Sequence, residues 1–331
     1  MLALTGAAGF IGSNLMAAWN IYENSPIAAF DVVDSAEKKA NIAQLRNVIW
    51  VEPTDTYAFL QANADSIDSL IHLGAETSTT VTDRGAVFKV NVELSKCLWS
   101  WCAENSVPFI YASSAAVYGD GSSGFLDDPA LDTLNQLKPL NIYAESKLAF
   151  DVFISQALAT GAARPPQWAG LRFFNVYGPR EAHKGSQASV VSQMLPSAIR
   201  GESYALFRSH RNGVADGKQM RDFVFVDDCI DVMRWLLKTP QISGILNVGS
   251  GSARTFLDLA NAVYSAAEQS PNITWRDTPA HIQDHYQYFT EANLERLRTT
   301  GYANSFTSLE DGVAITLRDY LSKLKPHQIS S

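Results

Sequence analysis

The chain has 331 residues, of which 46% are hydrophobic and 18% are charged, and its formal net charge is -8. This composition is typical of a globular protein with one large domain or two smaller ones, and the acidic balance disfavours a nucleic-acid partner or an anionic membrane surface. No apolar run approaches the ~18 unbroken residues of a membrane span, and the glycine-interrupted N-terminus lacks the basic region of a signal peptide.

Cysteine usage indicates a reducing compartment. The only cysteines are Cys97, Cys102 and Cys229, and no two of them form a CxxC pair. Three cysteines cannot build a disulfide framework, so we predict a cytoplasmic protein. Cys97 and Cys102 fall in an apolar helical pattern and are expected in the core. We expect no metal site.

The first two-thirds of the chain alternates short β-type runs with amphipathic stretches. The expected strands cover residues 2–6, 27–33, 69–75, 108–114 and 168–178. The helical patterns between them cover residues 12–22, 87–105 and 146–158. Alternating strands and helices with apolar strands predict an α/β fold of the Rossmann type, in which helices cover both faces of a doubly wound parallel sheet.

The pattern loosens after about residue 178. It predicts a helix over 189–202, a polar loop over 210–219, a strand running into a helix over 221–238, a strand over 244–251 and a helix over 256–269. We therefore predict a dinucleotide-binding domain over residues 1–175, with a return segment near 222–248. Residues 176–331 would mainly form a smaller α/β substrate-binding domain.

A glycine-rich turn follows the first strand. Gly6, Gly9 and Gly12 lie between that strand and the first helical pattern, in TGAAGFIGSN (5–14). Glycine lets the backbone approach a pyrophosphate closely, and a helix N-terminus supplies free N–H groups. A lone glycine pattern is weak support, but its place between a strand and a helix makes dinucleotide binding the favoured interpretation over a structural turn.

The second strand ends in an acidic residue. Asp31 is placed to hold the ribose hydroxyls of the adenosine, which favours NAD. Lys38 and Lys39 follow closely and can bind a 2′-phosphate, which favours NADP, or they simply begin a solvated helix. The residues alone leave both cofactors open.

Tyr143 and Lys147 form the motif YAESK. On a helix these two residues share a face, and a lysine ammonium near a phenol stabilises the phenolate, so the tyrosine can act as an acid or base near neutral pH. Ser113 and Ser114 end a predicted strand, where ligands of open α/β sheets bind. A hydroxyl there can hydrogen-bond a substrate oxygen that undergoes oxidation.

With these motifs the chain resembles the extended short-chain dehydrogenase/reductase family over nearly its whole length. The motifs that carry the resemblance are TGAAGFIGSN (5–14), HLGAETSTT (72–80), YASSAAVYG (111–119), NIYAESK (141–147), RFFNVYGPR (172–180) and RDFVFVDD (221–228). The resemblance implies Ser114 as the serine of a Ser-Tyr-Lys set that moves a hydride between a sugar carbon and a nicotinamide. It implies these further cofactor contacts: Phe10, Ile11, Val32, Leu73, Gly74, Ala75, Glu76, Thr77, Asn91 and Val176.

Three later stretches resemble the ADP-glyceromanno-heptose 6-epimerases within that family. They are EAHKGSQASV (181–190), ALF (205–207) with MRDFVFVDD (220–228), and HYQYFTEANL (285–294). Those enzymes interconvert two ADP-heptose epimers for the lipopolysaccharide inner core with tightly bound NADP and two bases. The resemblance implies Tyr143 and Lys184 as the bases, and it implies a homo-oligomer, a pentamer by analogy. Alternatively, Lys184 is a loop lysine that pairs with Glu181 or with a ligand phosphate.

The same resemblance implies a set of substrate contacts. They are Ser113, Asn175, His183, Ser186, Gln193, Phe207, Arg221 and Tyr286. Arg221 suits the diphosphate, because a guanidinium binds phosphate oxygens bidentately. Phe207 flanks the adenine or packs in the core, and His183 shapes its loop. Relatives often carry His at the position of Gln193 and Asp-Asn at the position of Asp31 and Val32, and the loop 210–219 is longer than expected.

Two other functions stay open. A UDP-hexose 4-epimerase of the same family would need no second base, and a 4,6-dehydratase would show an Asp-Glu pair near residue 115, which this chain lacks. A non-catalytic NAD(P)-binding sensor would have no use for an intact set of Ser114, Tyr143 and Lys147.

Overall fold

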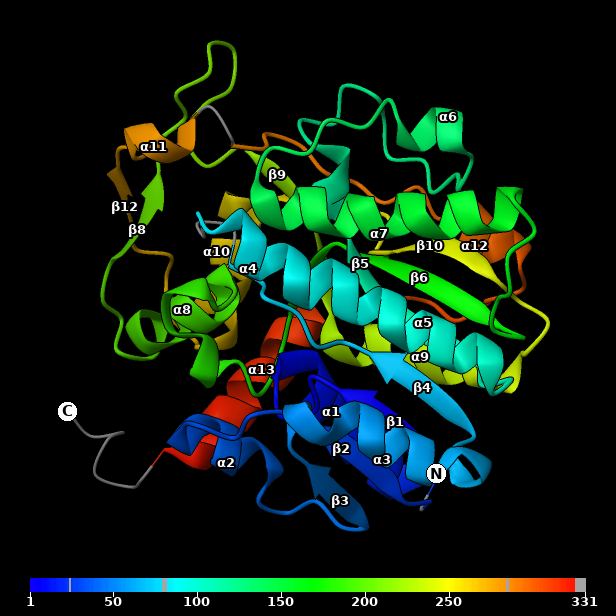
Figure 1. Ribbon diagram of the computed structural model, residues 1–331. Coiled ribbons are helices and arrows are strands. Elements are labelled where there is room, and N and C mark those ends of the chain that lie inside the picture. The colour runs from blue at the N-terminus through cyan, green and yellow to red at the C-terminus, as the bar shows by residue number, and fades with distance from the viewer. Residues whose placement is uncertain (24, 79–81, 284–285, 325–331) are drawn as a thin grey trace.

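The computed structural model describes residues 1–23, 25–78, 82–283 and 286–324. Its main sheet has seven strands, all parallel, in the order β10-β6-β5-β4-β1-β2-β3 (Figure 1). The strands are β1 (Leu2–Thr5), β2 (Ile27–Phe30), β3 (Val48–Val51), β4 (Ser69–His72), β5 (Phe109–Ser114), β6 (Trp168–Phe173) and β10 (Gly244–Val248). The order runs outward in both directions from β1, so the loop after β1 leaves the centre of the sheet.

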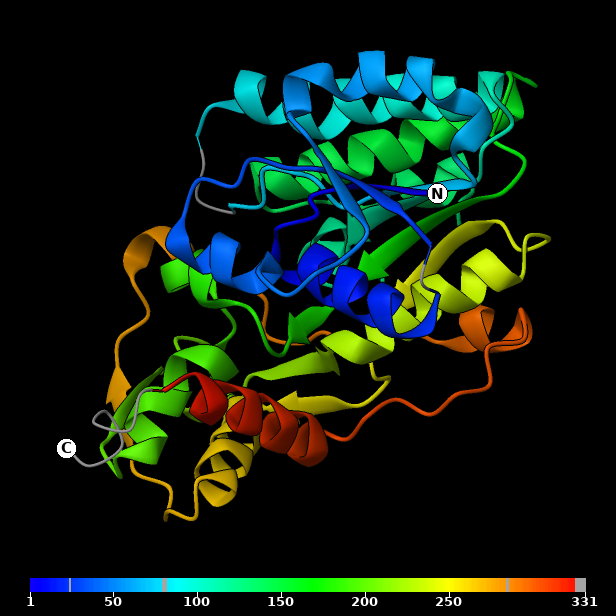
Figure 2. The same ribbon diagram turned by 90° about the horizontal axis from the view of Figure 1, so that it is seen from below.

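Helices cover both faces of this sheet (Figure 2). One layer holds α1 (Phe10–Tyr22) and α9 (Val226–Lys238), which pack on each other. The other layer holds α3 (Thr56–Ala62), α5 (Leu94–Glu104) and α7 (Ile142–Ala159). Strands β1, β2 and β4 are buried along their whole length. Burial on both faces explains why these strands are continuous apolar runs rather than alternating ones.

The second part of the chain adds two small sheets. One consists of β11 (Ala253–Thr255), β9 (Met220–Phe225) and β7 (Asn175–Tyr177), and the other pairs β12 (Ile273–Arg276) with β8 (Tyr204–Phe207). The helices near them are α8 (Val190–Ile199), α10 (Phe256–Ala266), α11 (Ala280–Gln283) and α13 (Leu309–Lys323). Helix α12 (Glu295–Thr299) instead lies against β10 of the main sheet. In Figure 1 the carboxyl ends of the central strands point towards α8, β8 and β12.

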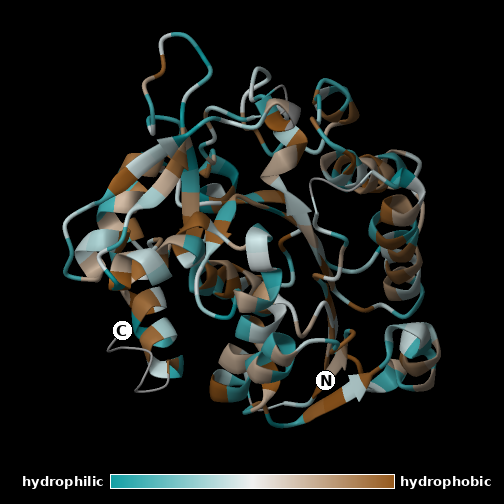
Figure 3. Cartoon of the chain, turned by 90° about the vertical axis from the view of Figure 1, so that its left-hand side faces the viewer, coloured by the Kyte–Doolittle hydropathy of each residue, from teal (hydrophilic) through white to brown (hydrophobic). Residues whose placement is uncertain are grey.

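Three short helical elements border the carboxyl edge of the sheet. They are α2 (Ala36–Ile42), α4 (Arg84–Phe88) and the short helical turn η5 (Ala182–Gln187). A single π-helical turn (Lys89–Glu93) joins α4 to α5, and α6 (Leu131–Leu134) contacts α7. Figure 3 shows that apolar residues are concentrated in the strands and the helices, whereas the connecting loops are mostly hydrophilic.

The predicted Rossmann-type parallel sheet is confirmed, and three details differ from the sequence expectation. The expected strand 168–178 breaks at Phe174, after which β7 leaves the main sheet and pairs with β9. Strand β3 was not expected, because its half-exposed edge position breaks the apolar pattern. Cys97 is exposed rather than buried, because it lies on the outward side of α5, whereas Cys102 is in the core.

The return of the chain to the first sheet is visible in β10, which pairs with β6, and in α9 against α1. The domain boundary at residue 175 stays a prediction. No helix in the described part of the chain is long and apolar enough to cross a membrane.

Candidate active site

The glycine-rich turn between β1 and α1 is closed by direct backbone contacts. Gly6 has φ +68°, and a Cβ on it would lie 2.6 Å from the Gly74 nitrogen. A Cβ on Gly12 would lie 2.1 Å from the Gly6 carbonyl oxygen. The N-cap of α1, Gly9, makes no side-chain capping hydrogen bond. The first N–H groups of α1 therefore lack a side-chain cap, which fits the pyrophosphate of a dinucleotide.

Asp31, at the end of β2, contacts this turn. Its Oδ2 accepts a hydrogen bond from the Ala8 N–H at 2.8 Å, and its Oδ1 lies 3.3 Å from Lys38 Nζ. Lys38 Nζ also donates to the Val32 carbonyl oxygen at 2.8 Å and lies 3.5 Å from Asp34. These residues therefore form one charged corner beside the glycine turn. Lys39 and the Val32 side chain are exposed at its rim.

The loop after β4 is fastened to α7 through Asn91. The Asn91 Oδ1 accepts from the Glu76 N–H at 2.8 Å, and its Nδ2 donates to the Glu76 carbonyl and to Ser146 Oγ, both at 2.9 Å. Ser146 Oγ in turn donates to the Tyr143 carbonyl oxygen at 2.7 Å. The π-helical turn places Asn91 inward. The other predicted contacts on this loop are partly buried at Leu73, Gly74 and Ala75 and exposed at Glu76 and Thr77.

A second buried chain of hydrogen bonds crosses from β1 to α5 through His72. Ser95 Oγ donates to the Asn91 carbonyl oxygen at 2.7 Å, so it accepts from His72 Nε2, 2.9 Å away. His72 Nδ1 is then the acceptor for the Thr5 hydroxyl at 2.6 Å. This pattern requires a neutral imidazole. Burial, with a smaller contribution from the charge of Lys147, lowers the pKa of His72 to about 3.

The predicted Ser-Tyr-Lys set comes together where β5 ends and α7 begins. Lys147 Nζ lies 5.8 Å from the centre of the Tyr143 ring and donates to the Ala112 carbonyl oxygen at 2.9 Å. Burial lowers the pKa of Lys147 to about 8, and Asp151 opposes that shift. Burial also raises the pKa of the Tyr143 phenol, and a hydrogen bond from Ser114 opposes the rise. Tyr143 thus keeps its proton at neutral pH, beside an ammonium and a hydroxyl that favour the phenolate.

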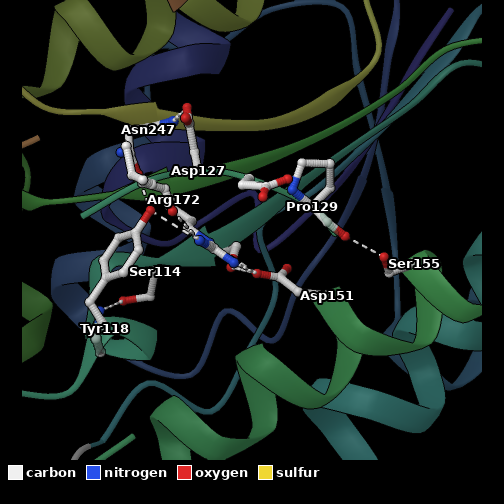
Figure 4. Close-up of polar contacts among 12 residues, drawn as sticks. Ser114, Tyr118, Asp127, Pro129, Asp151, Ser155, Arg172 and Asn247 are labelled. Carbon is white, nitrogen blue, oxygen red and sulfur yellow. Dashed lines mark hydrogen bonds and ion pairs between the residues drawn. The ribbon is translucent and has the colours of Figure 1, made fainter. Parts of the chain in front are cut away.

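Ser113 takes part in a buried polar cluster around Asp151. Figure 4 shows the Asp151, Arg172 and Tyr118 side chains of this cluster. Ser113 donates to Asp151 Oδ2 at 3.1 Å, and Tyr111 donates to Asp151 Oδ1 at 2.9 Å. Arg172 places Nη2 at 2.9 Å from Asp151 Oδ2, and neither side chain is exposed to solvent. Arg172 also donates to the Tyr118 hydroxyl at 3.0 Å. Ser113 is 2% exposed, so its assignment to the substrate stays a prediction that this geometry does not support.

The turn η5 carries Lys184 against the start of α1. Lys184 Nζ lies 5.1 Å from the centre of the Phe10 ring. The Glu181 carboxylate is buried and accepts from the Gly178 N–H at 3.0 Å and the Ser189 N–H at 2.5 Å. Glu181 thereby closes both ends of the turn. Lys184 makes no ion pair with Glu181 in the part of the chain that the structure describes, but its charge opposes the burial that raises the pKa of Glu181, so the interpretation of Lys184 as a loop lysine beside Glu181 stays a prediction.

The turn η5 is also fastened to α1 and α2. Asn14 donates to the Pro179 carbonyl oxygen at 2.9 Å, and Asn41 donates to the Arg180 carbonyl oxygen at 3.0 Å. The Arg180 guanidinium donates back to the Asn41 carbonyl oxygen. Asn41 Nδ2 also lies 3.3 Å from His183 Nδ1. The loop that carries Lys184 and His183 is therefore held by α1, which begins at the glycine-rich turn, and by α2.

Arg221 and Tyr286, both predicted to contact the substrate, lie together. The Arg221 guanidinium carbon is 5.3 Å from the centre of the Tyr286 ring, and Arg221 donates to the carbonyl oxygens of Met220, at 2.8 Å, and Gln287. Tyr286 also packs edge-on against His210 of the long polar loop, with ring centres 5.6 Å apart. The loop therefore reaches the aromatic side of this pair.

The remaining predicted contacts lie along the same side of the molecule. Gln193 Nε2 donates to the carbonyl oxygens of Ser186, at 3.2 Å, and Ala188, at 2.7 Å, so it holds the η5 loop from α8. Phe207 is partly buried with the Arg276 guanidinium carbon 4.4 Å from its ring centre. Asn175 and Ser186 are exposed, and Val176 is partly buried.

Several residues of this site were not found from the sequence. His72, Asn41, Asp151 and Arg180 all act through hydrogen bonds between distant segments, and single residues of these types carry no spacing signal. Asp151 is the exception, because its spacing of four residues from Lys147 places both residues on the same face of α7 and could have been noticed in the sequence.

Comparison with known proteins places this geometry in a family. Residues 2–249 match the model of the NAD dependent epimerase/dehydratase family. The chain belongs to this family. An ADP-L-glycero-D-manno-heptose-6-epimerase of Nitratidesulfovibrio vulgaris (strain DP4) is 41% identical over 98% of this chain and 99% of its own length. The protein of that name from Fusobacterium nucleatum is 39% identical over 98% of each chain. The assignment from sequence motifs is thereby confirmed.

The solved structures share the fold. The crystal structure of Helicobacter pylori ADP-L-glycero-D-manno-heptose-6-epimerase has a TM-score of 0.80 at 26% identity, and the comparison covers 98% of this chain and 96% of that chain. A UDP-N-acetylglucosamine 4-epimerase from Methanobrevibacter ruminantium has a TM-score of 0.82 at 22% identity over 98% of each chain. The second likeness shows the fold alone, so shape does not separate heptose from hexose epimerases.

Proposed function

We propose that this enzyme epimerises carbon 6 of ADP-D-glycero-D-manno-heptose to give ADP-L-glycero-D-manno-heptose. The observation that carries the proposal is a second proton-carrying side chain, Lys184, held against Phe10 at the start of α1, in addition to Tyr143 on α7. The relatives that are about 40% identical over nearly the whole chain bear the same activity in their names.

The cofactor is proposed to be NADP. Family membership supports a nicotinamide cofactor, which when bound accepts a hydride from the sugar carbon and returns it. The glycine turn and the uncapped N-terminus of α1 fit its pyrophosphate. Lys38, with Lys39 at the rim, offers cations where the adenosine ribose would lie beside Asp31, so a 2′-phosphate finds positive charge there. NAD would leave these lysines without a ligand charge.

Tyr143 acts at one position of the substrate oxygen. Its phenol lies beside the Lys147 ammonium and the Ser114 hydroxyl, both of which stabilise the phenolate that forms when the proton leaves. The pKa of Lys147, about 8, keeps most of this lysine charged at neutral pH. Ser114 additionally can hold the substrate oxygen, whereas the buried Ser113 positions Asp151.

Lys184 acts at the other position. Carbon 6 is exocyclic, so the ketone can be presented with either face to the cofactor, and its oxygen then occupies a different place in each half-reaction. One proton-transferring group near each place assists oxidation and reduction in both directions. The short hydrogen bonds of Glu181 and the contacts of Asn14 and Arg180 keep the Lys184 loop fixed during this exchange.

Arg221 is proposed to hold the substrate diphosphate. Two of its N–H groups are used by main-chain carbonyls, which orient the guanidinium and leave further donors for phosphate oxygens. Tyr286 and Phe207 supply aromatic faces for the adenine end, and Asn175, Ser186 and Gln193 line the side of the sugar. A cytoplasmic homo-oligomer, a pentamer by analogy, stays a prediction.

The test is to incubate purified protein with ADP-D-glycero-D-manno-heptose and to follow the carbon-6 epimer ratio by proton NMR, first without added cofactor and then with NADP or NAD. Approach to a mixture of both epimers supports the proposal, and turnover without added cofactor shows that the cofactor is retained. UDP-glucose and UDP-galactose serve as matched substrates. If the enzyme converts UDP-glucose or UDP-galactose and leaves the ADP-heptose unchanged, the proposed function is wrong and the enzyme is a 4-epimerase.

A further inference from the structure

The chain that follows α11 contacts two different parts of the site. Tyr286 and Tyr288 both pack edge-on against His210 of the long polar loop, with ring centres 5.6 Å and 5.2 Å away. Gln287, which lies between them in the sequence, is partly buried and instead donates through Nε2 to the Gly119 carbonyl oxygen at 2.5 Å. The two tyrosines therefore face the loop, whereas the Gln287 amide reaches the chain that follows β5.

The Gly119 carbonyl belongs to the turn that begins at the predicted catalytic serine. This short helical turn, η4 (Ala115–Tyr118), has Ser114 as its N-cap, and the Ser114 Oγ accepts from the Ala116 N–H at 3.1 Å. The Gly119 N–H closes the turn by donating to the Ala116 carbonyl oxygen, also at 3.1 Å. The Gln287 amide is therefore bonded to the same turn that carries the serine of the Ser-Tyr-Lys set.

The main chain of Gln287 serves the opposite end of the site. Its carbonyl oxygen accepts from Arg221 Nη2, while Arg221 Nη1 donates to the Met220 carbonyl oxygen at 2.8 Å. The Met220 N–H donates to the Tyr288 carbonyl oxygen at 3.0 Å, so this segment is fixed along the start of β9. Arg221 is buried and pairs with no carboxylate in the described part of the chain, so an anionic ligand group such as a diphosphate suits it.

We propose that Gln287 is a substrate-binding residue whose Oε1 atom accepts a hydrogen bond from a hydroxyl of the sugar. The sugar of an ADP-heptose connects the diphosphate, placed at Arg221, to the carbon that reacts beside Ser114. Gln287 is bonded to both of these places, so the sugar lies alongside its side chain. The inference rests on the proposed function and adds to it a residue that contacts the sugar itself.

The orientation of the amide leaves its oxygen available for this contact. A carbonyl oxygen only accepts, so Nε2 is the atom that faces Gly119. Among the residues that the structure describes, no group donates to the Gln287 Oε1. One amide can therefore hold the turn that carries Ser114 and bind a sugar hydroxyl at the same time.

The test separates binding of the nucleotide from binding of the sugar. Titration calorimetry gives the Kd values of ADP and of ADP-D-mannose, whose carbon 6 is a CH₂OH group and has no epimer, for the full-length protein loaded with NADP. Gln287→Met removes both polar atoms and keeps the length of the side chain, and Gln287→Asn keeps the amide but is one methylene shorter. Gln283→Met is the matched control, because the Gln283 amide donates to the Thr278 carbonyl oxygen at 2.7 Å instead of to η4.

A neutral hydrogen bond corresponds to about 3- to 10-fold in affinity. Gln287→Met should weaken ADP-mannose by about that factor and leave ADP unchanged, because the main-chain carbonyl still holds Arg221. Gln287→Asn should show the same pattern, since its shorter amide does not span Gly119 and the sugar together. With ADP-heptose, both variants should raise KM and also lower kcat, because the turn that carries Ser114 loses a hydrogen bond. Gln283→Met should change none of these values.

Three outcomes would overturn the proposal. If ADP and ADP-mannose weaken alike in Gln287→Met, the residue supports only the Arg221 end of the site. If the Kd of ADP-mannose stays at the wild-type value while kcat falls, Gln287 only holds the turn and does not bind the sugar. If Gln283→Met weakens ADP-mannose as much, the loss reflects a loosened segment. A wild-type protein that binds no ADP would refute the proposed function instead, and melting temperatures separate all these results from a loss of folding.

Discussion

Lys147 lies one helical turn after Tyr143, with its ammonium nitrogen 5.8 Å from the centre of the phenol ring and 2.9 Å from the Ala112 carbonyl oxygen. Asp151 lies one further turn along α7 and is fully buried in an ion pair with Arg172. The charge of Lys147, which stabilises the phenolate, is therefore maintained in part by a carboxylate that has no exposure to solvent.

Asp151 and Arg172 should control the pH range of catalysis in opposite directions. Asp151→Asn removes the charge that opposes the burial of Lys147, so the lysine loses its proton at a lower pH and the alkaline limb of the kcat profile moves below about 8. Arg172→Met leaves Asp151 unpaired, which strengthens its effect on Lys147 and moves that limb upward. The measurement is kcat between pH 6 and 10.

Both variants should lose about 3–5 kcal/mol of unfolding free energy, because each substitution removes one partner of the buried ion pair and leaves the other charge uncompensated. The similar loss of stability makes the opposite pH shifts informative. If the alkaline limb moves in the same direction in Asp151→Asn and in Arg172→Met, the shift reflects a loosened site. The electrostatic link between Asp151 and Lys147 is then refuted. Urea unfolding curves supply the stability control.

His72 should make stability depend on pH. Its folded pKa is about 3 and its ordinary value is 6.5, so between these values the unfolded chain binds a proton that the folded chain excludes. The stability that neutral His72 contributes is present in full above about pH 6.5 and is lost as the pH falls towards 3. At ~1.4 kcal/mol per pKa unit, the whole window amounts to about 5 kcal/mol.

His72→Gln keeps a donor and an acceptor but does not titrate. We expect the variant to be less stable than the wild type at pH 7.5, because its hydrogen bonds to Thr5 and Ser95 fit less well. Its unfolding free energy should fall less steeply between pH 6.5 and 4. Urea unfolding at four or five pH values gives both slopes, and parallel slopes for the two proteins would show that His72 is not the titrating group.

Much of the fold followed from the sequence, because apolar strands buried on both faces have a distinctive pattern. The same holds for Gly6 and Gly12, whose spacing is dictated by backbone contacts within a few residues. Strand β3 was missed because an edge strand is half-exposed and lacks that pattern. His72 and Asn41 were missed for a different reason. Their partners lie on segments 23 to 142 residues away, and only the folded chain brings them together.

Tyr143 and Lys184 should each be needed for oxidising a different epimer. The overall equilibrium is fixed by the two sugars, so steady-state turnover falls in both directions for either variant. The first half-reaction, in which one epimer is oxidised, distinguishes the two residues better than steady-state turnover does. On mixing with one epimer at a time, the rate at which reduced nicotinamide forms should fall about 10²- to 10⁴-fold for one epimer in Tyr143→Phe and for the other in Lys184→Met.

Equal losses for both epimers in both variants would contradict the assignment of two separate bases. Lys184→Arg provides the control for a lysine that merely binds a ligand phosphate, because arginine keeps the charge but does not exchange its proton. If Lys184→Arg retains the half-reaction that Lys184→Met loses, then Lys184 acts as a cation and not as a proton carrier.

Asp31 should hold the glycine turn as well as the ribose. Its carboxylate accepts the Ala8 N–H and pairs with Lys38, so Asp31→Ala releases the turn and frees Lys38 from one of its two carboxylate partners, the other being Asp34. We expect NAD to weaken by about 10- to 100-fold, since it loses both the ribose contact and the ordered turn, a combined effect near that of one or two charge-assisted hydrogen bonds. NADP should weaken less, because the freed Lys38 can bind its 2′-phosphate more closely. Asp31→Asn, which keeps one oxygen for the Ala8 N–H, should recover most of the NAD affinity. Titration calorimetry of both cofactors with the two variants checks this order, and an unchanged affinity of Asp31→Ala for NAD would remove Asp31 from the ribose site.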